Sequence, residues 1–337
     1  MIDAYGRTIS YLRLSVTDRC NLRCAYCMPA AMRFQPRSEL LDWDELDAVA
    51  SAFVGLGVRR LRLTGGEPLV RKGIVEFVER QSRHLHSGAL DEITMTTNGT
   101  ELERTAAALA KCGIKRINVS LDSPDPAKFE RITRGGQVNR VIAGIDAALA
   151  AGIAIKLNTV VLRNDNLDEV VDLAQWAHRR GASISFIEVM PLGDVEQSRI
   201  DQHVPMAAVR ELLEQRWTLI PSATRTGGPA RYFSTSDGGT IGFITPLSEN
   251  FCGGCNRVRV TASGQLCFCL GQNDGIDLRA VLRDPDRSQP LGSAIAAAIH
   301  RKPLGHDFRI ATMVTGAVAR HMSVTGAVAR HMSVTGG

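Results

Sequence analysis

Short apolar runs alternate with longer amphipathic segments over the first 190 residues. The runs are rich in β-branched residues and predict strands, while the segments between them carry apolar residues at helical spacing. The predicted strands are Leu12–Val16, Arg60–Thr64, Ile93–Thr97, Arg116–Leu121, Ile153–Val161 and Ser183–Val189. The predicted helices are Asp42–Leu56, Lys72–Leu85, Leu102–Lys111, Val138–Ala150 and Leu167–Arg180. Six strands alternating with five helices predict parallel strands with right-handed crossovers.

Residues at the helix ends agree with this pattern. Capping-box spacing occurs in two pairs, Asp42 with Glu45 and Asn166 with Glu169. Glycines follow three of the helices, as C-terminal caps do: Gly113, Gly152 and Gly181.

The strand–helix alternation stops at Pro191, before the eight units that a complete barrel needs. We therefore expect an α/β fold, an incomplete (β/α)6 TIM-like barrel over residues 1–190, with ligands at the carboxyl ends of its strands. For residues 191–337 the pattern predicts a smaller C-terminal α+β region, packed across the open side of the barrel. Its expected elements are a helix near Val204–Gln215, short strands between Trp217 and Cys269, and a helix around Ser293–Ile299.

Composition narrows the class of protein. Hydrophobic residues make up 44% of the chain and charged residues 22%, as in soluble globular proteins. The N-terminus lacks the apolar core of a secretion signal, and no segment offers about 18 unbroken apolar residues. We expect a cytoplasmic protein with reduced cysteines and no membrane partner. The net charge of +5 is spread along the chain, which favours a small anionic substrate over a nucleic-acid polymer.

The first cysteine group, Cys20, Cys24 and Cys27, has C-x3-C-x2-C spacing directly after the first predicted strand. An iron–sulfur cubane held by three thiolates keeps one iron without a protein ligand, and that iron can bind a small molecule. A zinc site, or a cluster with a fourth ligand from elsewhere, is the alternative. Tyr26 either packs in the loop or stacks on a bound adenine.

The second cysteine group combines Cys252 and Cys255 with a thiol from the C-F-C-L stretch, either Cys267 or Cys269. These last two thiols are two residues apart on one strand and so share a side of it. Both could therefore be ligands, and a zinc ribbon with four cysteines is the alternative. The remaining cysteine, Cys112, matches no ligand pattern and is interpreted as structural.

Two arginines follow the second group directly. Arg257 and Arg259 also share a side of a strand, as two guanidinium groups must to clamp one anion. A solvated strand face is the alternative.

The stretch C-N-L-R-C-A-Y-C resembles the signature of the radical S-adenosylmethionine superfamily. The resemblance implies that the open iron chelates the amino and carboxylate groups of S-adenosylmethionine, which one-electron reduction cleaves to a 5′-deoxyadenosyl radical. It also implies a partial barrel. The residues implied to bind S-adenosylmethionine are Tyr26, Gly66 in T-G-G-E-P, Ser120 in N-V-S-L-D and Met190 in I-E-V-M-P, and Thr97 in T-T-N-G is implied to lie near the substrate.

The pattern F-C-G-G-C-N-R-V-R, followed by C-L, resembles the GTP 3′,8-cyclase family of molybdenum cofactor biosynthesis. In that family the third ligand precedes Leu, which selects Cys269, and a second [4Fe-4S] cluster binds the guanine end of GTP. The resemblance implies that Arg257 and Arg259 are catalytic. The residues implied to contact GTP are Arg13, Arg62, Thr97, Lys156, Arg257, Val258 and Arg259. Structural ion pairs are the alternative for the cations inside apolar runs.

The implied activity is conversion of GTP to (8S)-3′,8-cyclo-7,8-dihydroguanosine 5′-triphosphate. The deoxyadenosyl radical removes the 3′ hydrogen of GTP, and the C3′ radical attacks C8 of guanine. The implied cofactors are two [4Fe-4S] clusters and S-adenosylmethionine. Expected partners are flavodoxin or a similar reductant, the downstream cyclic pyranopterin monophosphate synthase, and a second copy of the chain in a homodimer. The rival classes are a radical peptide modifier with an auxiliary cluster and a non-enzymatic zinc or iron–sulfur regulator.

The C-terminal tail contains the decapeptide V-T-G-A-V-A-R-H-M-S twice, at Val314–Ser323 and Val324–Ser333, followed by V-T-G-G. Two copies are too few for a solenoid, so the repeat is interpreted as a tandem duplication. Members of the family end in Gly-Gly, which reaches the active site, and Gly336–Gly337 supply that end here. The ten extra residues span up to about 33 Å when extended.

Deleting one copy of the decapeptide, residues 324–333, is expected to leave cyclisation of GTP intact, because the Gly-Gly end is retained. The cyclised product formed from GTP under reducing, anaerobic conditions measures this. Loss of product would show that the longer tail is functional.

Overall fold

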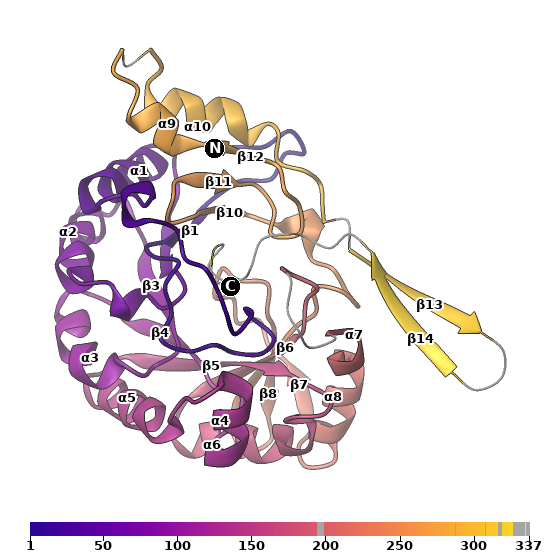
Figure 1. Ribbon diagram of the computed structural model, residues 1–337. Coiled ribbons are helices and arrows are strands. Elements are labelled where there is room, and N and C mark those ends of the chain that lie inside the picture. Colours follow the sequence, from indigo (N-terminus) through magenta and orange to yellow (C-terminus); the bar gives the residue numbers. More distant parts are fainter. Residues whose placement is uncertain (194–198, 287, 307, 316–318, 326–333, 335–337) are drawn as a thin grey trace.

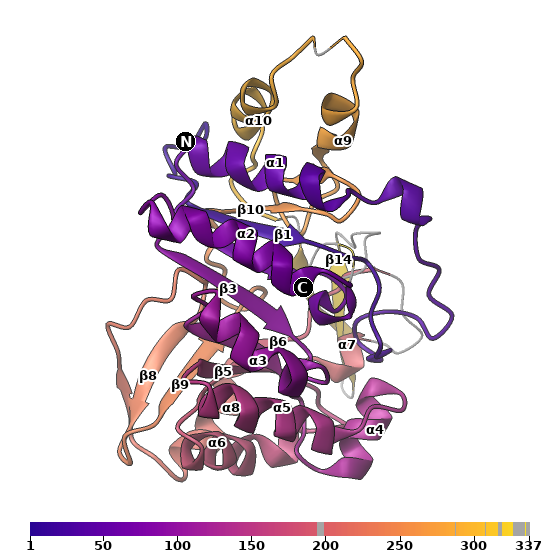
Figure 2. The ribbon, with the colours of Figure 1, turned by 90° about the vertical axis from the view of Figure 1, so that its left-hand side faces the viewer.

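The computed structural model describes residues 1–337 except 194–198, 287, 307, 316–318, 326–333 and 335–337. Its centre is a curved sheet of twelve strands in the order β12-β11-β10-β1-β2-β3-β4-β5-β6-β9-β8-β7. Helices cover the outer surface of this sheet (Figure 1). Figure 2 shows the molecule turned by 90°. In that view, helices α1, α2 and α3 lie in front of strands β1 and β3.

The six predicted strands are all present and pair in parallel along the chain. Their bounds are β1 Tyr11–Ser15, β2 Arg60–Thr64, β3 Glu92–Thr97, β4 Arg116–Ser120, β5 Ala154–Val161 and β6 Ser183–Glu188. The five predicted helices are also confirmed, as α1 Trp43–Gly55, α2 Ile74–His86, α3 Leu102–Lys111, α5 Val138–Ala150 and α6 Val170–Arg179. Short 3-10 turns are η1 Arg37–Glu39, η2 Pro68–Val70, η3 Leu167–Glu169 and η4 Cys252–Gly254.

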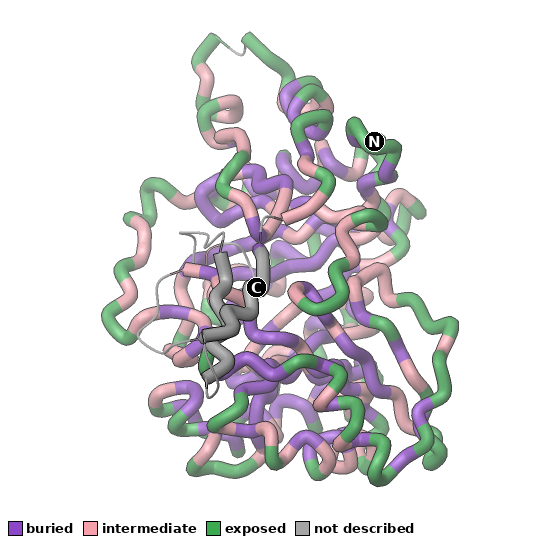
Figure 3. Tube along the Cα trace, turned by 90° about the vertical axis from the view of Figure 1, so that its right-hand side faces the viewer, coloured by how far each residue is buried: buried purple, intermediate pink, exposed green. Residues whose placement is uncertain are grey.

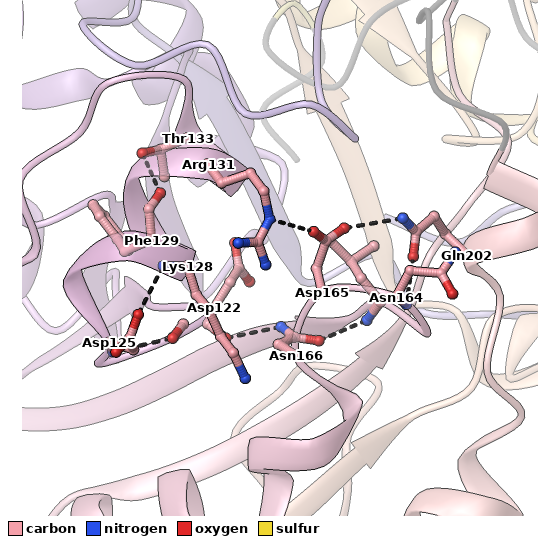
Figure 4. A network of polar contacts seen from close by, with 12 residues as sticks. Asp122, Asp125, Lys128, Phe129, Arg131, Thr133, Asn164, Asp165, Asn166 and Gln202 are labelled. Atoms are coloured by element: carbon pink, nitrogen blue, oxygen red, sulfur yellow. Dashed lines mark hydrogen bonds and ion pairs between the residues drawn. The ribbon is translucent and has the colours of Figure 1, made fainter.

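Helix α4, Pro126–Thr133, was not predicted. It begins after Asp125, whose carboxylate accepts a hydrogen bond from the backbone N of Lys128 at 2.8 Å (Figure 4). Eight residues give too few turns for a clear apolar period, although the N-cap and the proline at the first helical position were visible in the sequence.

One of the two predicted capping boxes is wrong. Asp42 forms its box with Glu45, but Asn166 makes no capping hydrogen bond. The Asn166 side chain instead accepts from the backbone N of Leu162 at 2.8 Å and donates to the carbonyl of Asp122 at 2.8 Å (Figure 4). Buried next to two strand ends, Asn166 satisfies backbone groups there. The glycine C-caps are confirmed, because Gly113, Gly152 and Gly181 all have positive φ.

The C-terminal region continues the barrel sheet instead of packing across its open side as a separate layer. Strand β9 (Thr240–Ile244) pairs in parallel with β6, and β10 (Arg257–Val260) pairs in parallel with β1. The sheet therefore gains one parallel strand at each edge of the predicted six. These pairings join segments far apart in sequence, which periodicity alone does not reveal. The partial TIM-like barrel is confirmed, and the domain boundary at residue 190 stays a prediction.

The remaining elements flank these strands. Antiparallel strands extend each edge, namely β7 Leu219–Pro221, β8 Arg231–Thr235, β11 Gln265–Cys267 and β12 Gly275–Asp277. The helices of this region are α7 Arg199–Gln202, α8 Met206–Glu214, α9 Leu278–Leu282 and α10 Leu291–Ile299. Strands β13 (Arg309–Thr315) and β14 (Ala319–Thr325) pair antiparallel in a separate two-stranded sheet, which includes Val314–Thr315 and Ala319–Ser323 of the first decapeptide copy. Residues 316–318 of that copy and Gly336–Gly337 lie outside the described residues.

The core lies between the sheet and its outer helices. Buried residues run through the interior, and exposed residues lie mainly on the outer loops and helices (Figure 3). On β1, Leu12 and Leu14 are fully buried in the helix-facing core, while Arg13 between them lines the barrel interior. Among the described residues, no helix is long and apolar enough to cross a membrane.

Gly144 on α5 is a close-packing point that supports the carboxyl end of β3. A Cβ at Gly144 would overlap the carbonyl oxygen of Gly99 and lie 3.0 Å from Cβ of Leu102. By contrast, a Cβ at Gly55 on α1 would meet nothing within 4 Å.

Gly144→Ala is therefore expected to lower the free energy of unfolding by about 1–3 kcal/mol through overpacking, despite the helix propensity gained. Gly55→Ala, the matched control, should leave stability unchanged or raise it by up to about 1 kcal/mol. Thermal unfolding of both variants checks this, and equal melting temperatures would contradict the close contact.

Candidate functional site

Two neighbouring cavities lie inside the barrel, one beside each cysteine group. Cys20, Cys24 and Cys27 line the first cavity. Cys252, Cys255 and Cys269 line the second, which has an empty volume of about 1280 Å³, part of it open to solvent. Tyr26 lines both cavities, so the two cysteine groups face neighbouring spaces with this side chain in common.

The T-G-G-E-P turn after β2 packs against the chain leading into the first cysteine group. Gly66 donates its N–H to the carbonyl of Thr17 at 2.7 Å. A Cβ on Gly65 would lie 2.5 Å from that same oxygen, and one on Gly66 would overlap the backbone of Arg19. Both glycines are thus required for this close approach, and both line the first cavity.

Glu67 is a buried residue of the site that was not predicted from the sequence, although it is part of the T-G-G-E-P motif. Its carboxylate accepts from the Thr97 hydroxyl at 2.7 Å and from the backbone N atoms of Asn98 at 2.6 Å and Leu69 at 3.0 Å. Burial raises the pKa of Glu67 to about 7, although these three hydrogen bonds act to lower it. Glu67 thereby ties the β2 end to the β3 end. Thr97, predicted near the substrate, lines the first cavity.

Tyr26 is held in place by Asp122, which was also missed. The Tyr26 hydroxyl donates to Oδ2 of Asp122 at 2.8 Å, and the other carboxylate oxygen accepts from the backbone N of Val160 at 2.9 Å. Burial raises the pKa of Asp122 to about 6. Asp122 is the final residue of the N-V-S-L-D motif, and that position was the sequence signal that could have identified it.

Two further residues predicted to bind S-adenosylmethionine lie on different cavities. Ser120 lines the first cavity with Gly66. Met190 lines the second cavity, so the structure does not place it beside the first cysteine group.

The two candidates for the third thiol of the second group, Cys267 and Cys269, lie differently relative to the end of β11. Cys267 is the last residue of β11 and is fully buried, whereas Cys269 follows the strand and lines the cavity with Cys252 and Cys255. The expectation that both thiols share a side fails because the strand does not continue to Cys269. Cys269 is therefore the residue available for the second group.

Three cysteine thiols line each cavity, the number that a [4Fe-4S] cluster with one open iron requires. In the described part of the chain, no three His, Cys, Asp or Glu side chains converge closely enough to hold one metal ion. A cubane is wider, and its thiolates stand further apart around it. The three thiols on each cavity wall therefore suit a cluster with one open iron.

The electrostatics of the two groups differ. Burial raises the pKa of Cys20 to about 11 and that of Cys24 well above its usual value. Burial also acts on Cys255, but the charges of Arg257 and Lys302 outweigh it and lower its pKa to about 7. Metal binding must therefore displace protons from the first group, while Cys255 in the second is closer to the thiolate form at neutral pH.

Five cations line the second cavity: Arg13, Arg62, Lys156, Arg257 and Arg259. They come from β1, β2, β5 and β10, whose alternation turns them inward. The side chain of Val258, between two of the arginines, is instead buried in the core, so only its backbone can face a ligand there.

Two of these cations, Arg62 and Lys156, are buried away from water. Arg62 is 5% exposed and Lys156 4%, and neither forms an ion pair with a described residue. Lys156 donates to the Tyr232 hydroxyl at 2.6 Å, and the Arg62 Nε has no hydrogen-bond partner among the described residues. Burial lowers the pKa of Arg259 to about 10 and that of Lys156 well below its usual value. This cavity is suited to a polyanion.

Glu188 is the only acidic side chain among the described residues that line the second cavity. Its carboxylate is already occupied, because it accepts from the backbone N atoms of Leu247 at 2.9 Å and Ser248 at 3.1 Å, and from the Ser248 hydroxyl. It supplies one negative charge against the five cations of this cavity wall.

Comparison with solved structures supports the fold. Streptococcus suis SuiB bound to precursor peptide SuiA has a TM-score of 0.61 at 15% identity, covering 89% of this chain and 72% of that one. SuiB bound to S-adenosylmethionine has a TM-score of 0.60 at 15% identity, covering 89% of this chain and 73% of that one. At this identity the likeness shows a shared fold alone.

Sequence comparison is more specific. The family model described as the Radical SAM superfamily matches residues 14–177, and the one described as Molybdenum Cofactor Synthesis C matches residues 182–308. The GTP 3′,8-cyclase of Caulobacter vibrioides is 58% identical over 96% of this chain and 93% of its own length. That of Mesorhizobium japonicum is 55% identical over 96% of this chain and 98% of its own. The chain therefore belongs to the GTP 3′,8-cyclase family of the radical S-adenosylmethionine superfamily.

Proposed function

We propose that the two neighbouring cavities carry out one reaction, the conversion of GTP to (8S)-3′,8-cyclo-7,8-dihydroguanosine 5′-triphosphate. One observation carries this proposal: two groups of three cysteines face cavities that meet at Tyr26, and the second cavity is lined by five cations. Each cysteine group offers three thiols, so each cluster keeps an iron for a small-molecule ligand.

The first cavity is proposed to hold a [4Fe-4S] cluster on Cys20, Cys24 and Cys27, together with S-adenosylmethionine. When bound, these two cofactors supply a 5′-deoxyadenosyl radical. Gly66 leaves room for the ligand at the end of β2, and Ser120 offers a hydroxyl at the end of β4. Tyr26, fixed by its bond to Asp122, presents its ring at the junction of the cavities. Met190 would contact the same cofactor from the second cavity.

The second cavity is proposed to hold GTP. Arg257 and Arg259 clamp the triphosphate from one strand, and Arg13, Arg62 and Lys156 complete its charge neutralisation. Val258 contributes its backbone, and Thr97 adds a polar contact from the first cavity. A second [4Fe-4S] cluster on Cys252, Cys255 and Cys269 is proposed to bind the guanine end.

The cavity also protects the reaction. Apolar side chains also line the second cavity: Val160, Ile187, Val189, Phe268 and Leu270. These walls keep water away from a reactive radical and hold one C–H bond close to it.

The partners follow from this chemistry. The loop around the first cysteine group is basic, with Arg23 stacked over the ring of Phe34 at 4.9 Å and Arg33 and Arg37 exposed nearby. This surface suits an acidic reductant such as flavodoxin. Cyclic pyranopterin monophosphate synthase is proposed to consume the product. A homodimer, a cytoplasmic location and a domain boundary at residue 190 complete the proposal.

Reconstituted anaerobically and reduced, the protein is expected to cleave S-adenosylmethionine and convert GTP, giving 5′-deoxyadenosine and the cyclised nucleotide in comparable amounts. Chromatography of both products checks this. Absence of 5′-deoxyadenosine would contradict a radical enzyme, and cleavage without consumption of GTP would favour a peptide modifier.

Arg259→Gln is expected to weaken GTP binding about 10- to 100-fold, because a charge-assisted hydrogen bond contributes about 1.5–3 kcal/mol. Arg231→Gln is the matched control, since Arg231 is 58% exposed and pairs with Glu249 at the surface. Equilibrium dialysis with GTP measures both. An unchanged dissociation constant for Arg259→Gln would exclude the proposed clamp.

A further inference from the structure

The segment Lys302–His306, K-P-L-G-H, packs against the second cysteine group, and its last residue, His306, lines the second cavity. A Cβ on Gly305 would lie 3.4 Å from Sγ of Cys252, so the segment runs directly along this thiol. The His306 Nε2 lies 2.7 Å from the carbonyl of Pro246, which fixes the far end of the segment.

Arg7 holds the middle of this segment. Its guanidinium donates to the carbonyls of Pro303 at 2.6 Å and Leu304 at 2.7 Å, and also to the carbonyl of Cys252 at 2.9 Å. Asp3 pairs with Arg7 at 2.6 Å. The N-terminus therefore joins the segment to the cysteine loop, and the position of Lys302 is well determined.

Lys302 is a buried cation directed at a thiol. Its side chain is 2% exposed, and its Nζ lies 3.6 Å from Sγ of Cys255 and 2.7 Å from the carbonyl of Phe268. Within the described residues it forms no ion pair. A buried ammonium without an acidic partner is costly, so this charge calls for an anion at the Cys255 sulfur.

A cluster thiolate is that anion. We propose that Lys302 is a positioning residue for the second cluster: it donates to the Cys255 thiolate, offsets the negative charge of the cluster and raises its reduction potential. This inference rests on the proposed function, because it takes Cys252, Cys255 and Cys269 as ligands of that cluster. Hydrogen bonds and charges at cluster sulfurs are among the main determinants of such potentials.

Lys302 acts through Cys255 and not on the substrate. It is absent from the residues that line the second cavity, whereas Arg257, whose NH2 lies 3.8 Å from the same sulfur, is on the cavity wall. The Cys255 sulfur thus has one cation on the substrate side and one on the protein side. Only Lys302 can be changed without removing a group proposed to bind GTP.

The test uses two proteins. In the first, the full chain has Cys20, Cys24 and Cys27 all changed to Ala, so that only the second cluster is bound. The second is the intact holoenzyme. In Lys302→Met we expect a more negative midpoint potential, because the reduced cluster loses a compensating charge. We also expect iron to be held about 10- to 100-fold less tightly against a chelator. Potentiometry followed by electron paramagnetic resonance, with iron analysis, measures both.

Lys302→Gln keeps a donor for the Phe268 carbonyl but loses the charge, and Lys302→Arg keeps the charge. The expected order of potentials is wild type and Lys302→Arg highest, then Lys302→Gln, then Lys302→Met. If Lys302→Met does not fold, the Gln and Arg variants decide. Arg301→Gln is the control, since the adjacent Arg301 is 53% exposed and pairs with Asp274, and its potential should match wild type.

An unchanged potential in Lys302→Gln and Lys302→Met, with iron retained, would overturn the inference while leaving the proposed function intact. If the variant lacking the first three cysteines binds no cluster at all, the proposed second cluster itself fails, and the inference with it. The two failures are therefore distinguished by iron content before any potential is measured.

Discussion

The two-residue period of parallel strands is the constraint on which the rest of this structure depends. On β1, β2 and β10, leucines and valines face the outer helices while the arginines between them face the barrel interior. The same residues that form the hydrophobic core therefore force the cations inward. Because Arg62 is deeply buried and has no acidic partner among the described residues, the stability of the fold and the binding of an anion are coupled at one site.

The carboxyl ends of the strands then place the remaining chemistry around this charged interior. The first cysteine group follows β1, while Glu67 joins the end of β2 to that of β3. Asp122, after β4, fixes the ring of Tyr26 where the two cavities meet. The second cysteine group enters beside β1 because β10 pairs with that strand. The two cysteine groups, at residues 20–27 and 252–269, thus line neighbouring cavities.

Charge balance around the second cysteine group extends the same logic beyond the cavity wall. Arg257 reaches the Cys255 sulfur from inside the barrel, and Lys302 reaches it from the outer side. Arg7 closes this arrangement by binding carbonyls from both the cysteine loop and the segment after Lys302. Both chain ends therefore contribute to the surroundings of one thiol, which explains why the fold needs more than the six-strand barrel.

The sequence by itself determined the six parallel strands, the helices with strong apolar periods, both cysteine groups and the inward cations, because these depend on spacing within single elements. Only the tertiary structure decided that β9 and β10 continue the sheet, that Cys269 and not Cys267 faces the cavity, and that Met190 lies in the second cavity. It also revealed Glu67, Asp122 and Lys302, whose importance lies in burial and in partners distant along the chain. Local periodicity carries no information about such partners, since hydrogen bonds between remote segments form only when the whole chain packs.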